Sequence, residues 1–203
     1  MKRDEGYENI CLENFEWDST WIEQTKNKDA LRIFYIGDSI SNVARGYATR
    51  HSENSILFDG LGTSKAVDNP YFYDTVRLFA DQQRQRCAIL FNSGLHGPHL
   101  TNEEYKEHYE KFILFLLKEF ENTPLILLLS TAQTDPCRNE RVIKRNEAVL
   151  ELADKHGLSV IDLYSVTKSN PQLISADGIH MLPEGYSLLG KEIVAGVKRI
   201  LDI

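Results

Sequence analysis

Cysteine is scarce in this sequence, and the few cysteines present do not form a recognisable pattern. The three are Cys11, Cys87 and Cys137. An odd number at wide spacing, with no CxxC pair, favours neither a disulfide framework nor a structural zinc site. Reduced thiols in a cytosolic protein are the simpler interpretation. We therefore expect no metal and no other cofactor.

Long apolar runs and basic clusters are also missing. The longest aliphatic run, Leu125–Leu129, is far shorter than the roughly 20 residues that span a bilayer. The first residues, MKRDEGYENICLENFEWD, lack the apolar segment of a secretory signal. The net charge of −7 disfavours a nucleic-acid partner, because phosphate binding needs a basic face. We expect a cytoplasmic protein that binds neither membrane nor nucleic acid; no pattern indicates an oligomeric state.

The composition is that of an ordinary soluble globular protein. Of the 203 residues, 42% are hydrophobic and 26% are charged, which is enough for one domain with a sizeable core. The sequence shows no internal repeat and no linker. We expect a single domain over residues 1–203, with a core from 31 to 200 and an N-terminal extension, residues 1–28, held to the core by Trp17 and Trp21.

Five apolar runs are the clearest signal of secondary structure. Most are apolar nearly throughout, which is typical of strands covered on both faces. Helical patterns separate them; one begins with a capping box, Thr101 and Glu104. Strands alternating with helices predict an α/β fold with a parallel sheet. The predicted strands are Leu31–Ile36, Ser55–Phe58, Cys87–Phe91, Pro124–Leu129 and Leu158–Leu163.

Small and polar residues follow these strands, and they are the candidates for a functional site. In an open parallel sheet, ligands bind outside the carboxyl ends of the strands. The residues expected to converge there are therefore those that come directly after a strand or before the last helix. They are Ser39, Gly62, Asn92, His96, Asp177 and His180.

These residue types suit nucleophilic catalysis on a carbonyl. The hydroxyl of Ser39 needs a base to take its proton, and His180 is the candidate. Asp177, three residues earlier, can orient that ring and stabilise its charged form. The negative oxygen of the intermediate needs donors, for which we select the amides of Ser39 and Gly62 and the side chain of Asn92.

Three blocks of the sequence carry a family resemblance. Gly37-Asp38-Ser39-Ile40 matches the nucleophile block of the SGNH, or GDSL-type, esterases and lipases, and Asp177-Gly178-Ile179-His180 matches their DxxH block. Gly62-Thr63-Ser64-Lys65-Ala66 is similar to the glycine block of the carbohydrate-acetylesterase branch. The likeness spans about residues 31 to 200. It implies a flavodoxin-like, three-layer α/β/α sandwich with a five-stranded parallel sheet in the order 2-1-3-4-5, and ester hydrolysis through an acyl-serine without metal.

The third family block departs from its usual pattern, Gly-x-Asn-Asp. The chain has Asn92-Ser93-Gly94-Leu95-His96 instead. Either Asn92 or His96 can serve as the third oxyanion donor. We favour Asn92, because a neutral amide donates without titrating. His96 and Asp38 are then candidates for contact with substrate.

Each motif also has an ordinary structural interpretation. Gly37-Asp38-Ser39 can be a strand-to-helix turn with Asp38 or Ser39 as the helix cap. Asp177-Gly178 is a common turn dipeptide, and Gly60 can replace Gly62 in its role. His96 and His99 can be considered as metal ligands, although no carboxylate cluster accompanies them in the sequence.

Two functions follow from these patterns. The first is a serine esterase that acts on a small acyl ester, with acetyl groups on a carbohydrate as one candidate substrate. The second is a catalytically weak or inactive member of the same fold that binds carbohydrate or another partner. The patterns GxGxxG, GxxxxGK[ST] and GxSxG are absent, which disfavours the dinucleotide-binding, P-loop and α/β-hydrolase folds.

Overall fold

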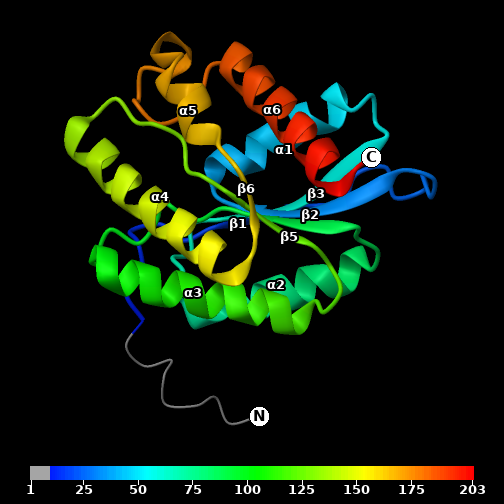
Figure 1. The fold of residues 1–203 in the computed structure, drawn as a ribbon, viewed down its shortest axis with the longest axis horizontal. Helices are drawn as coiled ribbons and strands as arrows, with labels where there is room; N and C mark the ends of the chain where they lie inside the picture. The colour runs from blue at the N-terminus through cyan, green and yellow to red at the C-terminus, as the bar shows by residue number, and fades with distance from the viewer. Residues whose placement is uncertain (1–9) are drawn as a thin grey trace.

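A computed structural model describes residues 10–203 and contains a central sheet between two layers of helices (Figure 1). The six strands lie in the order β1-β3-β2-β4-β5-β6. Strands β2 to β6 are parallel, and β1 is antiparallel to β3 at the edge. The bounds are β1 Asp18–Trp21, β2 Leu31–Gly37, β3 Ile56–Thr63, β4 Ala88–Phe91, β5 Leu125–Leu128 and β6 Ser159–Ile161.

The predicted fold is confirmed, with one strand added. The five expected strands pair in parallel in the predicted order 2-1-3-4-5, counted along the chain from β2. The sixth strand, β1, comes from the N-terminal extension and pairs Ser19 with Gly62. The edge of β3 is therefore covered, and the four-residue strand β1 forms the edge of the sheet instead.

Helices cover both faces of the sheet. Helices α1, α5 and α6 pack on one face, and α2, α3 and α4 pack on the other (Figure 1). None of the helices within residues 10–203 is long and apolar enough to cross a membrane. The helices are α1 Ser39–His51, α2 Pro70–Gln83, α3 Asn102–Glu119, α4 Pro136–His156, α5 Leu163–Lys168 and α6 Pro183–Leu201, with a short 3-10 helix at Pro171–Leu173.

The central strand β2 explains why the sequence shows apolar runs instead of alternation. Ile33 and Tyr35 pack against the α1/α6 layer, while Phe34 and Ile36 pack against the α2/α3 layer. All four are buried. Both faces of the strand must therefore be apolar, and the strand brings its carboxyl end to a fixed position at the middle of the sheet.

Helix ends agree with the local signals. The capping box is present, with Thr101 Oγ1 accepting from the Glu104 amide at 3.2 Å. Helix α4 ends at Gly157, whose φ of +63° is the left-handed conformation that favours glycine. Helix α6 begins with Pro183, which needs no hydrogen-bond acceptor in the first turn.

Strand β3 is longer than the predicted Ser55–Phe58 and continues through the two glycines. A Cβ at Gly60 would collide with the side chain of Arg45. The guanidinium of Arg45 lies on the ring of Trp21 in β1. The glycines are thus strand residues that leave room for side chains of α1, and the sequence alone reads them as a loop because glycine usually interrupts strands.

Candidate active site

Ser39, His180 and Asp177 form a hydrogen-bonded chain at the carboxyl edge of the sheet. The Oγ of Ser39 lies 2.9 Å from Nε2 of His180, and Nδ1 of His180 lies 2.7 Å from Oδ2 of Asp177. Because a carboxylate only accepts, Nδ1 carries the hydrogen and Nε2 accepts from the serine hydroxyl. This is the arrangement in which a histidine can take a proton from a serine nucleophile.

Ser39 is presented by a capped turn between β2 and α1. Asp38 is only 2% exposed, and its Oδ1 accepts from the amides of Ile40 at 3.0 Å and Ser41 at 3.2 Å. The amide of Ser39, the first residue of α1, has no acceptor among the described residues, as expected for the first turn of a helix. The carboxylate of Asp38 thus caps the helix, and this buried position does not support the predicted contact with substrate, which stays a prediction.

The loop that carries Asp177 and His180 is fixed by its own hydrogen bonds. Oδ1 of Asp177 accepts from the amides of Ile179 and His180, both at 2.9 Å. These amides, with the His180 ring, hold the pKa of Asp177 well below its usual range. Gly178 has a φ of +76°, and its carbonyl accepts from the amide of Thr134 at 3.0 Å. The loop is therefore tied to the segment after β5.

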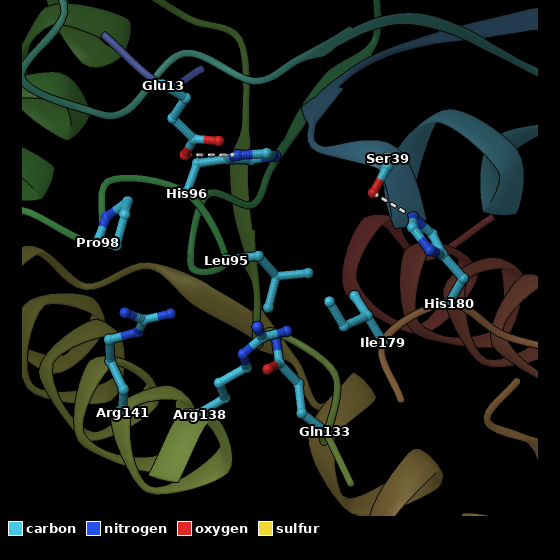
Figure 2. Close-up of a pocket in the computed structure, with 10 residues that line it drawn as sticks. All are labelled: Glu13, Ser39, Leu95, His96, Pro98, Gln133, Arg138, Arg141, Ile179 and His180. Carbon is cyan, nitrogen blue, oxygen red and sulfur yellow. Dashed lines mark hydrogen bonds and ion pairs between the residues drawn. The ribbon is translucent and has the colours of Figure 1, made fainter. Parts of the chain in front are cut away.

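A pocket of about 490 Å³ opens beside Ser39 and His180. That size is typical of a site for a small ligand. Figure 2 shows the serine and histidine on one side and two arginines of α4 on the other. The lining residues are Glu13, Ser39, Leu95, His96, Pro98, Gln133, Arg138, Arg141, Ile179 and His180.

Asn92 does not line this pocket. Its side-chain amide donates to the carbonyl of Leu128 at 2.9 Å and to Oγ of Ser130 at 3.1 Å. Both hydrogens of the amide are thus used to join the ends of β4 and β5. In this arrangement no hydrogen of that amide remains for a ligand, so the geometry does not support the predicted oxyanion role of Asn92, which stays a prediction.

Gly62 does not line the pocket either, and its amide faces the edge strand. The amide of Ser64 donates to the carbonyl of Trp17 at 3.1 Å. Hydrogen-bonded pairs alternate along an antiparallel ladder, so Ser19 and Gly62 form the next such pair. A Cβ at Gly62 would lie 2.8 Å from Cβ of Asn42. Close packing between β3 and α1 thus accounts for the glycine, and its oxyanion role stays a prediction that this geometry does not support.

His96 lines the pocket, and its ring is held from the N-terminal side. Nδ1 lies 3.0 Å from Oε1 of Glu13, and the ring meets Trp17 edge to face at a centroid distance of 6.4 Å. Nε2 is buried and has no partner among the described residues. The backbone around His96 is held by Arg145, which is 0% exposed and donates to the carbonyls of Gly94, His96 and Gly97.

The spacing of the third family block explains this position. His96 stands two residues after Gly94, as the asparagine stands after the glycine in Gly-x-Asn-Asp. Aligning the block on this glycine, instead of on the end of the strand, would have put the histidine at the asparagine position. The spacing in the sequence therefore already indicated His96 as the residue at the asparagine position of this block.

The two histidines of the loop after β4 do not share a metal site. Nε2 of His99 lies 2.8 Å from Oδ2 of Asp68, while His96 pairs with Glu13. Within residues 10–203, no three His, Cys, Asp or Glu side chains are grouped so that they could hold a metal ion.

Four polar or charged lining residues were not anticipated from the sequence. Glu13 belongs to no motif. Gln133, Arg138 and Arg141 lie beyond β5, where the rule that ligands bind at strand ends applies. A helical-wheel count over α4 would have placed the two arginines on one face.

Comparisons with known proteins agree with this fold. No family model matches the chain. The "Isoamyl acetate-hydrolyzing esterase" of Schizosaccharomyces pombe (strain 972 / ATCC 24843) is 31% identical in an alignment over 126 residues that covers 56% of this chain and 51% of that protein. The match therefore spans about half the length of this relative.

Solved structures extend the likeness to most of the chain. The lipase/acylhydrolase from Enterococcus faecalis has a TM-score of 0.67 at 20% identity and covers 84% of this chain and 96% of its own. A member of the lipolytic protein G-D-S-L family from Veillonella parvula DSM 2008 has a TM-score of 0.65 at 18% identity, with 82% and 97% covered. The chain has the fold of the SGNH, or GDSL-type, hydrolases, and the resemblance seen in its motifs is confirmed.

Proposed function

We propose that the protein is a serine esterase that hydrolyses the acetyl ester of a small alcohol. The observation that carries this proposal is the hydrogen-bonded chain from Ser39 through His180 to Asp177 at the wall of a ligand-sized pocket. The name of the Schizosaccharomyces pombe relative supports an acetyl ester as the substrate. The fold of the structural neighbours supports the same class of reaction.

In the first half of the reaction, Ser39 Oγ attacks the ester carbonyl while His180 Nε2 takes the hydroxyl proton. A tetrahedral oxyanion forms. The bond from the carbonyl carbon to the alcohol oxygen then breaks, and His180 returns its proton to the departing alcohol. Asp177 keeps the ring oriented and stabilises its charged form throughout. The product is free alcohol and an acetyl group on Ser39.

In the second half, water replaces the alcohol. His180 Nε2 takes one proton from the water as its oxygen attacks the acetyl carbonyl. The bond between that carbon and Ser39 Oγ breaks, and the proton passes to the serine. Acetic acid leaves, and Ser39 is regenerated. One water is consumed for each ester.

Two groups are proposed as donors to the oxyanion. The first is the amide of Ser39, which starts α1 and has no acceptor among the described residues. The second is Nε2 of His96, which is buried and unpartnered there. With Nδ1 donating to Glu13, Nε2 donates only when the ring carries both hydrogens. Oε1 of Glu13, 3.0 Å from Nδ1, holds the ring in the orientation that this role requires.

The size of the acyl group is set by the residues beside the nucleophile. Ile179 lies beside His180, and Leu95 lies between that side of the pocket and the arginines (Figure 2). These two side chains give the pocket an apolar surface near the nucleophile. We therefore assign the acyl group to the side of Ser39 and His180 and the alcohol to the α4 side.

A series of p-nitrophenyl esters from acetate to dodecanoate tests the proposal. The highest kcat/KM is expected for the acetate, and Ser39→Ala should reduce hydrolysis to the uncatalysed background. Isoamyl acetate and an acetylated monosaccharide, assayed side by side, distinguish a small alcohol from the carbohydrate predicted by resemblance. Hydrolysis that persists in Ser39→Ala, or its absence from the wild type with every ester, would contradict the proposal and favour a binding function.

A further inference from the structure

The wall of the pocket opposite the nucleophile carries two cationic side chains. Arg138 and Arg141 belong to the first two turns of α4, and both line the pocket that contains Ser39 and His180. Their guanidinium groups extend from α4 toward the gap below Pro98 and Leu95 (Figure 2). The reacting serine therefore faces a positively charged wall.

Neither guanidinium has a partner within residues 10–203. No hydrogen bond or ion pair of these side chains is present there, although the amide of Arg138 is bonded to the helix-capping Asp135. Arg145, one turn further on the same face, differs sharply. It is fully buried, and its guanidinium donates hydrogen bonds to the carbonyls of Gly94, His96 and Gly97. Arg145 thus supports the loop after β4, whereas no such structural role among the described residues explains Arg138 and Arg141.

A neutral polar group completes this wall. Gln133 is only 8% exposed, lines the pocket, and has an Oε1 atom that is buried without a partner. A buried, unpartnered amide oxygen costs free energy unless a ligand supplies a donor. The oxygen of Gln133 therefore suits a donor group elsewhere on a ligand, because an anionic group itself offers no hydrogen to it.

The local charge contrasts with that of the whole chain. The net charge is −7, yet two cations three residues apart on a helix lie close enough to repel each other. The N-terminal end of α4 adds a further positive potential. Two carboxylates lie near, but Glu13 is engaged by His96 and the amide of Gly97, and Asp135 accepts from the first turn of the helix. No side chain of the described residues neutralises the arginines.

We propose that the alcohol part of the ester carries an anionic group, a carboxylate or a phosphate, which binds to Arg138 and Arg141. Two planar guanidinium forks match the oxygens of such a group. The acyl carbon binds at Ser39, on the side of the pocket opposite the two arginines (Figure 2), so we assign the anion to the alcohol. This inference rests on the proposed esterase function and narrows its substrate to an anionic acetyl ester.

Matched aromatic esters test the inference with the whole chain. Para-acetoxybenzoate carries a carboxylate, para-acetoxyphenyl phosphate carries a phosphate, and para-acetoxybenzamide is the neutral counterpart. At low ionic strength the wild type should prefer at least one anionic ester over the amide in kcat/KM, by roughly tenfold or more. The ester with the larger preference identifies the anion. The preference should shrink as NaCl is raised from about 50 to about 500 mM, because salt screens exposed charges.

Variants assign the preference to the arginines. The double variant Arg138→Gln/Arg141→Gln should bring the ratio of anionic to neutral kcat/KM close to that of the uncatalysed reactions. Lys144→Gln removes the same kind of charge from α4 but lies outside the pocket, and it should keep the wild-type ratio. Equal kcat/KM for anionic and neutral esters in the wild type, or an unchanged ratio in the double variant, would overturn the inference while leaving esterase activity intact.

Binding without turnover separates this inference from the proposed reaction. Calorimetry on Ser39→Ala should detect tighter binding of para-acetoxybenzoate or para-acetoxyphenyl phosphate than of the amide. If the wild type cleaves none of the three but this preference is measured, the anion site stands and the esterase function fails. If Ser39→Ala binds all three equally, the anion site is refuted whatever the activity.

Discussion

Glu13 and His96 lie 83 positions apart in the chain, and Oε1 of the glutamate is 3.0 Å from Nδ1 of the histidine. The same oxygen accepts from the amide of Gly97 at 3.2 Å. The segment before β1 therefore forms part of the pocket wall and holds a ring that faces the candidate nucleophile. Removing residues 10–21 would remove part of the pocket wall as well as the edge strand β1.

Glu13→Gln should lower kcat more than it changes KM. Glutamine keeps an oxygen that accepts from Nδ1 of His96 and from the Gly97 amide, so the ring stays in place. Only the negative charge of the Glu13 carboxylate is lost. The difference between a charged and a neutral hydrogen bond predicts a loss of about tenfold in kcat. Steady-state kinetics on p-nitrophenyl acetate measure it.

Glu16→Gln is the matched control in the same segment. The Glu16 carboxylate accepts from Oγ of Ser64 and from the amide of Glu13, and it does not contact His96. Its kcat should remain near the wild-type value. Equal kinetics in the two variants would show that the charge of Glu13 has no part in the reaction.

Replacing His96 should lower kcat, whereas replacing Asn92 should lower the melting temperature. An oxyanion donor acts mainly near the transition state, so its loss lowers kcat and leaves KM nearly unchanged. His96→Ala should reduce kcat by about 10²–10³, the usual effect of one lost donor. His96→Asn, which supplies a neutral amide, should recover part of that loss.

Asn92→Ala should instead lower the melting temperature. Its amide joins the carbonyl of Leu128 and the hydroxyl of Ser130, and leaving these groups unpaired destabilises the fold by roughly 1–3 kcal/mol. The kcat of each folded molecule should be preserved. A large loss of kcat at an unchanged melting temperature would restore Asn92 as the oxyanion donor in place of His96.

Asp177 should remain ionised throughout the working pH range. The amides of Ile179 and His180 and the His180 ring hold the pKa of its carboxyl below the usual value. A depressed folded-state pKa stabilises the fold above the unfolded-state value, about 3.9, and that contribution is lost as the pH falls through the folded-state value. As the pH is lowered to about 4, the fall in kcat/KM should therefore correspond to the binding of one proton only. The binding of two protons over that range would contradict this account.

Asp177→Asn separates the charge of this residue from its role in the loop. The Asn oxygen still accepts from both amides, so the melting temperature at neutral pH should change little. Without the carboxylate the ring loses its preferred tautomer, and kcat should fall by roughly 10⁴-fold. A variant that is folded, by circular dichroism, and retains full activity would refute the orienting role.

Hydrolysis should survive prolonged dialysis against EDTA. His96 and His99 are engaged by Glu13 and Asp68, and the proposed reaction uses serine and histidine alone. Activity that is lost on chelation and restored by added zinc would revive the two histidines as metal ligands.

The sequence was sufficient to predict the fold and to predict that Ser39, Asp177 and His180 lie together at one edge of the sheet, because these features are encoded locally. Apolar runs define the strands, and a contiguous motif at a strand end fixes where its side chains meet. The direction of the Asn92 side chain could not be predicted from the sequence, because it depends on the neighbouring strand β5. The Asn92 amide donates to the carbonyl of Leu128 at the end of that strand and to Oγ of Ser130. Glu13 could not be found because its contact with His96 requires the antiparallel pairing of β1 with β3, to which no local pattern points.

The central claim is that His180 activates Ser39. A serine-directed organophosphonate, followed by mass spectrometry of the digested protein, tests it most directly, because an unassisted serine hydroxyl reacts slowly. We predict one adduct per chain, on Ser39, and its disappearance in a folded His180→Ala variant. An adduct on another serine, or undiminished labelling of Ser39 without His180, would contradict the account.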